Sequence, residues 1–82
     1  MEFSNVRVEL GNRDGRFYVK VLKPPFLEFD DVQFGFMTTS IRIHEAFNKM
    51  LHHGGSLRVV CDMEVEKIEG VTYVFIYAWS FC

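Results

Sequence analysis

The sequence predicts a small α+β domain, in which one helix packs on one face of an antiparallel sheet of four to five strands. Several segments alternate apolar and polar residues, which is the pattern of strands whose two faces differ. One segment between them repeats apolar residues at a period of 3.6, which is typical of an amphipathic helix. The 82 residues suffice for one domain only, so residues 1–82 are expected to form a single, complete small protein. The expected order of elements is β-β-(β)-α-β-β.

The N-terminal part of the chain predicts a β-hairpin. Its first strand is expected over Asn5–Leu10 and its return strand over Arg16–Lys23. The Asp-Gly pair at 14–15 between them is a strong signal for a hairpin turn. Two prolines at 24–25 end the second strand, because proline cannot donate a hydrogen bond to a neighbouring strand.

The middle of the chain predicts a short third strand followed by the helix. Residues Val32–Met37 alternate again, whereas the segment 26–31 is ambiguous. The candidate N-caps of the helix are Thr38, Thr39 and Ser40. Its apolar stripe consists of Ile43, Ala46, Phe47, Met50 and Leu51. Gly54 and Gly55 form the expected C-cap, which gives a helix of about thirteen residues.

The C-terminal part of the chain predicts a second hairpin, whose last strand is strongly aromatic. Residues Leu57–Glu66 alternate, a turn is expected at Glu69-Gly70, and Val71–Cys82 forms the return strand. Successive side chains on a strand point to opposite faces, so the odd positions of this last segment should form one unbroken aromatic row. The row consists of Tyr73, Phe75, Tyr77, Trp79 and Phe81.

The aliphatic side chains of the strands can be collected on one face of the sheet, opposite the helix stripe. They are Val6, Val8 and Leu10; Phe17, Val19 and Val21; Leu57, Val59, Cys61 and Met63; and Val74, Ile76 and Ala78. A single helix covers a single face, so the aromatic row is expected on the other face, where it needs a partner. The alternative, with equal weight, is that the sheet curls and the row becomes the core together with Phe26, Phe34 and Phe36.

Charge and composition exclude several classes of protein. The net charge is −2 and the nine basic residues are scattered, which argues against binding to duplex nucleic acid. No apolar run approaches the roughly 20 residues of a membrane-spanning helix, and no signal peptide is evident. The two cysteines, Cys61 and Cys82, are expected to be reduced, so the expected location is the cytoplasm. Glu64, Glu66 and Glu69 are interpreted as a solvated sheet edge that discourages aggregation.

No pattern for catalysis, metal binding or cofactor binding is found. The three histidines, His44, His52 and His53, have no ligand spacing that Cys61 could complete. Cys61 is interpreted as a small buried hydrophobe rather than a nucleophile. No glycine-rich phosphate loop opens a helix. The chain is therefore expected not to be an enzyme.

The best functional hypothesis is a protein-binding module that acts as an inhibitor or adaptor on a larger protein or complex. It rests on the absence of catalytic patterns and on the aromatic content of 16%. The expected partner-binding residues are Tyr73, Tyr77 and Trp79, with Arg58 and Tyr18 beside them.

Size and form also match phage-encoded inhibitors of host defence of the anti-CRISPR type. A viral protein of that kind would act in the host cytoplasm. Two alternatives stay open: a single-stranded nucleic-acid-binding protein that uses an aromatic sheet face, and a structural homodimer.

Overall fold

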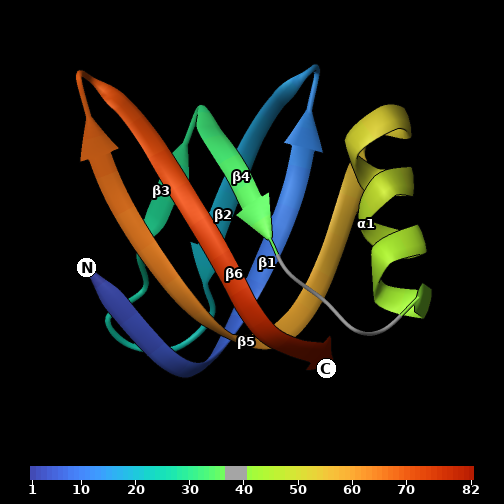
Figure 1. Cartoon of the computed structure of the whole chain (residues 1–82), viewed down its shortest axis with the longest axis horizontal. Coiled ribbons are helices and arrows are strands. Elements are labelled where there is room, and N and C mark those ends of the chain that lie inside the picture. The colour runs from blue at the N-terminus through green and yellow to red at the C-terminus, as the bar shows by residue number, and fades with distance from the viewer. Residues whose placement is uncertain (37–40) are drawn as a thin grey trace.

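A single curled sheet of six strands forms the body of the protein (Figure 1). This computed structural model describes residues 1–36 and 41–82, and the side chain at 36 is not described. The strands are β1 (Glu2–Arg13), β2 (Arg16–Val21), β3 (Glu28–Asp30), β4 (Val32–Phe36), β5 (Gly55–Ile68) and β6 (Val71–Phe81), and the helix is α1 (Ile41–His53). Across the sheet the strands follow the order β3-β2-β1-β5-β6-β4.

For the described residues the predicted α+β class with one helix is confirmed, but the predicted sheet is too small and too regular. It has six strands and is mixed, because β4 runs parallel to β6 while the other neighbours are antiparallel. The ambiguous segment 26–31 contains β3, and the expected third strand exists as β4. The predicted N-caps at 38–40 lie outside the described residues.

The two outermost strands of the sheet are adjacent in the chain. Strands β3 and β4 stand at opposite ends of the strand order, yet only Asp31 separates them. Its φ of 56° lies in the left-handed region, which aspartate tolerates better than most residues. The sheet must therefore curl until its ends meet, and the rings of Phe17 on β2 and Phe34 on β4 contact each other with centroids 5.6 Å apart.

The connectivity is that of a Greek-key barrel. If β3 and β4 are counted as one bent strand, five strands close into a barrel in the order 1-2-3-5-4, and the helix follows the third. This is the strand arrangement of the OB-fold. Since unrelated functions occur on one fold, the arrangement alone assigns no activity.

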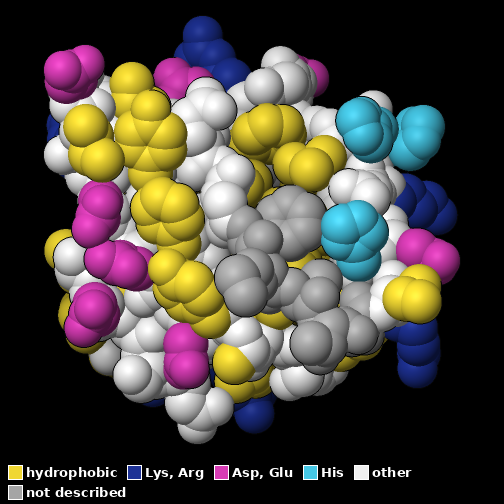
Figure 2. All heavy atoms as spheres, in the orientation of Figure 1, with side chains coloured by type: hydrophobic (Ala, Val, Ile, Leu, Met, Phe, Trp, Pro, Cys, Tyr) yellow, Lys and Arg dark blue, Asp and Glu magenta, His cyan; other side chains and the backbone are white. Residues whose placement is uncertain are grey.

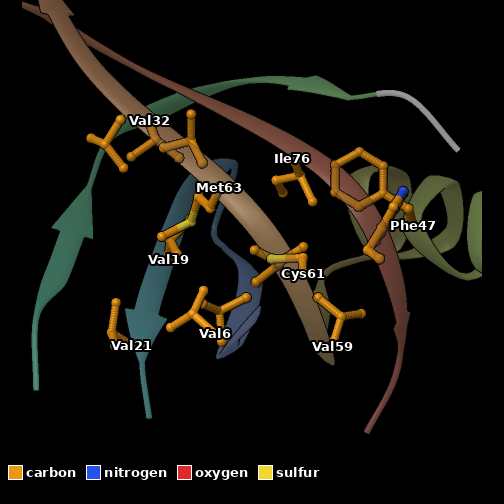
Figure 3. Close-up of a cluster of buried hydrophobic side chains, with 14 of the residues drawn as sticks. Val6, Val19, Val21, Val32, Phe47, Val59, Cys61, Met63 and Ile76 are labelled. Carbon is orange, nitrogen blue, oxygen red and sulfur yellow. The ribbon is translucent and has the colours of Figure 1, made fainter. Parts of the chain in front are cut away.

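The hydrophobic core fills the inside of the curl, where side chains from several strands and α1 converge (Figure 3). The buried side chains are Val6, Val8, Leu10, Val19, Val21, Val32, Ile43, Phe47, Met50, Val59, Cys61, Met63, Val65, Val74, Ile76 and Trp79. The predicted aliphatic faces are confirmed in large part, with Phe17 and Leu57 half-buried against this core. Ala78 is the exception, because its side chain is exposed.

Helix α1 has the predicted length of thirteen residues and the predicted C-cap. The amide of Gly54 donates to the carbonyl of Met50 at 3.0 Å, with a φ of 83° that favours glycine. Asn12 on β1 fixes this end of the helix, because its Nδ2 donates to the carbonyls of Met50 and Leu51 at 3.3 and 3.0 Å. No helix in the described part of the chain is long and apolar enough to cross a lipid bilayer.

A β-bulge divides the aromatic strand β6 into two parts. Val60 pairs with Ser80 but Asp62 pairs with Tyr77, so β6 has one more residue than β5 between these pairs. Ala78 lies in this irregular stretch with a φ of 45°, and the side chains beyond it change faces. Trp79 therefore points inward, is only 6% exposed, and packs edge-on against Phe47 at 5.3 Å. The predicted unbroken row on one face is wrong.

The bulge predicts a large and a small loss of stability on alanine substitution at two nearby aromatic positions. Trp79→Ala should lower the free energy of unfolding by about 3–5 kcal/mol, because it opens a cavity in the core. Tyr77→Ala should lower it by less than about 1 kcal/mol, since this ring lies on the surface. Urea unfolding followed by far-UV circular dichroism measures both, because Trp79 is the single tryptophan and fluorescence would be lost. Equal losses at the two positions would contradict the bulge.

Candidate functional site

Three ring side chains form a row on the outer surface of β6. Tyr73, Phe75 and Tyr77, here called the aromatic strip, alternate with the buried Val74 and Ile76 and so point away from the core. Tyr77 is 39% exposed, and the other two rings are half-buried. Figure 2 shows hydrophobic side chains in a column over β6, beside a column of acidic side chains. None of these three rings is part of the hydrophobic core that the described residues form.

The central ring of the strip lies on backbone. Phe75 pairs with Gly35 on β4, and a Cβ at Gly35 would lie 2.8 Å from Cδ1 of the Phe75 ring. A larger residue at 35 would therefore push the ring away. The absence of a side chain at Gly35 lets Phe75 extend across β4 and widens the apolar surface beyond β6.

Acidic residues lie directly opposite each ring of the strip. The pairs across β5 and β6 are Asp62 with Tyr77, Glu64 with Phe75 and Glu66 with Tyr73. Glu2 on β1 pairs with Glu64 on the other side. Directly opposite residues in antiparallel strands have Cβ atoms about 4.5–5.5 Å apart, so Asp62, Glu64 and Glu66 adjoin the rings, whereas Glu2 lies one strand further away. These four carboxylates are here called the acidic strip.

Perturbed pKa values mark the concentration of negative charge. The pKa of Glu64 is raised, first by a hydrogen bond with Glu66, then by partial desolvation and by repulsion from Glu66. The N-terminal ammonium and a hydrogen bond with Tyr77 act in the opposite direction but do not prevail. The pKa of Tyr77 is raised by desolvation and by the charges of Glu64, Glu66 and Glu2. Both shifts have the sign that neighbouring negative charge produces.

The five predicted binding residues do not form one surface. Tyr73 and Tyr77 lie together on the aromatic strip, whereas Trp79 is in the core, which corrects its predicted exposure. Arg58 pairs with Glu9, with 3.4 Å between Nε and Oε1, and lies beyond the strip, near the end of β6. Tyr18 is on β2, at the level of Ser56 on β5. Asp62, which pairs with Tyr77, lies six residues further along β5 than Ser56, and six residues of a strand span roughly 20 Å.

Tyr18 forms a separate, self-contained cluster. Its ring covers Gly11. The guanidinium of Arg13 lies 4.6 Å from the ring centroid, and the ammonium of Lys20 lies 5.4 Å from it. The hydroxyl of Tyr18 donates to Glu9 at 3.0 Å. Burial and Glu9 raise the pKa of this hydroxyl. A cleft of about 280 Å³ adjoins the ring and is lined by Arg13, Arg16, Phe17, Tyr18, Asp30 and Asp31. Its basic and acidic side chains are mixed, and Tyr18 is only 9% exposed.

Neither a metal-binding cluster nor a reactive buried thiol is found among the described residues. They contain no group of three or more side chains that could hold a metal ion. Cys61 is buried as predicted, and burial, with the charges of Asp62 and Cys82, raises the pKa of its thiol to about 12. A thiol that stays protonated is a poor nucleophile and a poor ligand.

Sequence reasoning missed the acidic strip as a neighbour of the rings. The sequence predicts a solvated sheet edge at Glu64 and Glu66, but β5 lies between β1 and β6, which corrects that prediction. The signal was present: carboxylates recur at 62, 64 and 66 while rings recur at 73, 75 and 77. A hairpin turn at Glu69-Gly70 places these two series opposite each other.

No family model matches the chain, and comparisons with curated proteins and with solved structures found no significant match. Function is therefore inferred from the geometry of the described residues.

The coupling of the two glutamates predicts an effect of pH. Glu66→Gln should lower the pKa of Glu64, because it removes a negative neighbour and supplies an amide donor. Because the pKa of Glu64 is higher in the folded than in the unfolded state, the protein loses stability as the pH rises from the unfolded-state pKa through the folded-state pKa. The variant should lose less stability over this pH range, because the two pKa values of Glu64 lie closer together. NMR titration of the side-chain carboxyl carbons measures the pKa. An unchanged Glu64 pKa in the variant would contradict the coupling.

Proposed function

We propose that the protein is a non-enzymatic protein-binding module, an inhibitor or adaptor that docks on a larger protein through the aromatic strip. The observation that carries this proposal is the row Tyr73, Phe75 and Tyr77 on the outer surface of β6, which no described helix covers. Tyrosine and phenylalanine are enriched in the centres of protein interfaces, where they combine a large apolar area with a polar tip.

The strip is well suited to binding because it is held rigidly. All three side chains stand on one strand between β5 and β4, and Phe75 rests on Gly35. Binding therefore orders few groups, which reduces the entropic cost of association. The exposed part of the strip is modest in area, so a partner must add contacts on the neighbouring acidic strip.

The acidic strip favours a protein partner over nucleic acid at this surface. Asp62, Glu64 and Glu66 would repel phosphates, whose binding depends on basic side chains. Self-association is also less favoured, because a twofold interface uses the same patch on both copies and would bring two acidic strips into one contact.

Single-stranded nucleic-acid binding is the second candidate, and two observations favour it at a different place. The strand order is that of an OB-type barrel, in which the face of strands 2 and 3 binds oligonucleotides. Here that face has Arg13, Arg16 and Lys20 around Tyr18. Nucleic-acid binding is the weaker candidate, because Lys20 is already paired with Glu28 at 3.9 Å and the Tyr18 ring is already covered.

Cys61 is buried and the pKa of its thiol is raised, so this side chain is a poor candidate for a catalytic nucleophile. Composition and size predict that the protein acts in the cytoplasm. If the chain is viral, they predict that it acts in a host cell against a defence complex.

Removal of the strip rings should abolish partner capture without unfolding the protein. The double variant Tyr73→Ser/Tyr77→Ser is compared with wild type as affinity-tagged full chains in extracts of the native host. Phe26→Ser is the matched control, because Phe26 is 72% exposed and lies off the strip. We expect a protein retained by wild type and the control to be lost with the double variant. With that protein purified, calorimetry should show binding at least about tenfold weaker.

Two results would overturn the proposal. The first is equal retention of the captured protein by the double variant and wild type. The second is binding of a labelled single-stranded oligothymidine that falls steeply with salt and is lost in Arg13→Gln/Arg16→Gln, which would favour nucleic acid. Unfolding measurements on each variant exclude loss of structure as the cause.

A further inference from the structure

We infer that the aromatic and acidic strips together bind an extended, basic segment of the partner protein, with Lys or Arg at alternate positions. This inference rests on the proposed function and names the chemistry of the partner at the same surface. Three features carry it: the unbalanced charge of the acidic strip, a complete ring–carboxylate–cation cluster elsewhere in the protein, and the spacing along β6.

The charge of the acidic strip is not balanced by side chains of the described residues. The two ion pairs among them join Lys20 to Glu28 and Arg58 to Glu9, and neither involves the strip. The one positive group that acts on Glu64 is the N-terminal ammonium, and the pKa of Glu64 is raised despite it. Oδ1 of Asp62 already accepts a hydrogen bond from the backbone amide of Asn5 at 2.9 Å, but this donor carries no formal charge, so the acidic strip still leaves room for cations from another molecule.

The Tyr18 cluster shows what a completed arrangement of this kind contains. There a tyrosine hydroxyl donates to the carboxylate of Glu9, while the guanidinium of Arg13 lies 4.6 Å from the ring centroid. On β6 a tyrosine again lies beside carboxylates, because Tyr77 pairs with Asp62 and has Glu64 as its diagonal neighbour on β5. The cation–ring contacts found among the described residues involve Tyr18 and Phe81, and none lies on the aromatic strip. A cation supplied by a partner would complete the arrangement.

The spacing of the strip determines the form of the partner segment. Rings at 73, 75 and 77 stand on alternate positions of one strand, with carboxylates at 66, 64 and 62 beside them. Alternate residues on a strand are about 6.6–6.8 Å apart, and the same spacing holds for any extended peptide. A segment with cationic side chains at i, i+2 and i+4 therefore matches the strip, and each cation meets one ring and one carboxylate.

Peptide titrations on the ¹⁵N-labelled full chain test this inference. The probes are two synthetic peptides of equal composition, Arg-Ser-Arg-Ser-Arg-Ser and Arg-Arg-Arg-Ser-Ser-Ser, so that charge is constant and spacing varies. We expect the alternating peptide to shift the amide signals of Tyr73, Phe75 and Tyr77, and to bind at least about threefold more tightly than the block peptide. Raising the salt from low to physiological strength should weaken both.

Charge variants separate the strip from general attraction. Glu64→Gln/Glu66→Gln should weaken binding of the alternating peptide by about tenfold, because each exposed pair contributes up to about fivefold. Glu45→Gln, on the exposed side of α1, removes the same kind of charge elsewhere and should change binding less than about twofold. Shifts confined to another surface, or equal binding by the double variant and wild type, would overturn the inference.

The capture assay, repeated with the charge variant, distinguishes failure of the basic-segment inference from failure of the docking surface itself. If a captured protein needs Tyr73 and Tyr77 but binds Glu64→Gln/Glu66→Gln as well as wild type, the docking surface stands and the basic segment is wrong. If the captured protein ignores the rings as well, both proposals fail. A concentration-dependent dimer in light scattering that Tyr77→Ser dissociates would identify a second copy as the occupant and overturn the basic segment.

Discussion

The link of one residue between β3 and β4 is the constraint from which the rest of the structure follows. Asp31 connects the two ends of the strand order, so the sheet cannot lie flat and must bring those ends together. Curling gives the sheet an inside, which its own side chains and the apolar stripe of α1 fill. One helix is then enough, because it does not have to cover a flat face. The outside of β6 is left without a covering element in the described residues.

The bulge at Ala78 determines which aromatic residues stabilise the fold and which are available to a partner. Alternation alone would put Tyr77 and Trp79 on the same face, but the extra residue turns Trp79 toward Phe47. The two expectations about the aromatic row were each right in part. The sheet curls, Trp79 enters its core and Phe34 packs against that core, while Tyr73, Phe75 and Tyr77 stay outside. Phe26, expected in the core if the sheet curls, is instead exposed.

Local patterns predicted local structure well, and pairing between distant segments poorly. Both hairpins, the helix and most of the inward-facing aliphatic residues could be predicted, because each depends on periodicity within a few residues. The parallel pairing of β4 with β6 could not, since alternation does not reveal a strand's neighbour. Nor could the bulge, because alanine is not a residue that signals a positive φ. Of the predicted site residues, Tyr73 and Tyr77 share a surface. The positions of Arg58 and Tyr18 relative to them could not be predicted, because they depend on the order of the strands in the sheet.

Gly35 beneath Phe75 has a consequence for how the surface withstands sequence change. The ring is supported by main-chain atoms of β4, and these remain the same whatever side chains surround them. Substitutions at neighbouring exposed positions can therefore alter charge and polarity around Phe75 while its platform is preserved. Such a layout lets the chemistry of this surface vary without rebuilding the scaffold, provided that position 35 stays glycine.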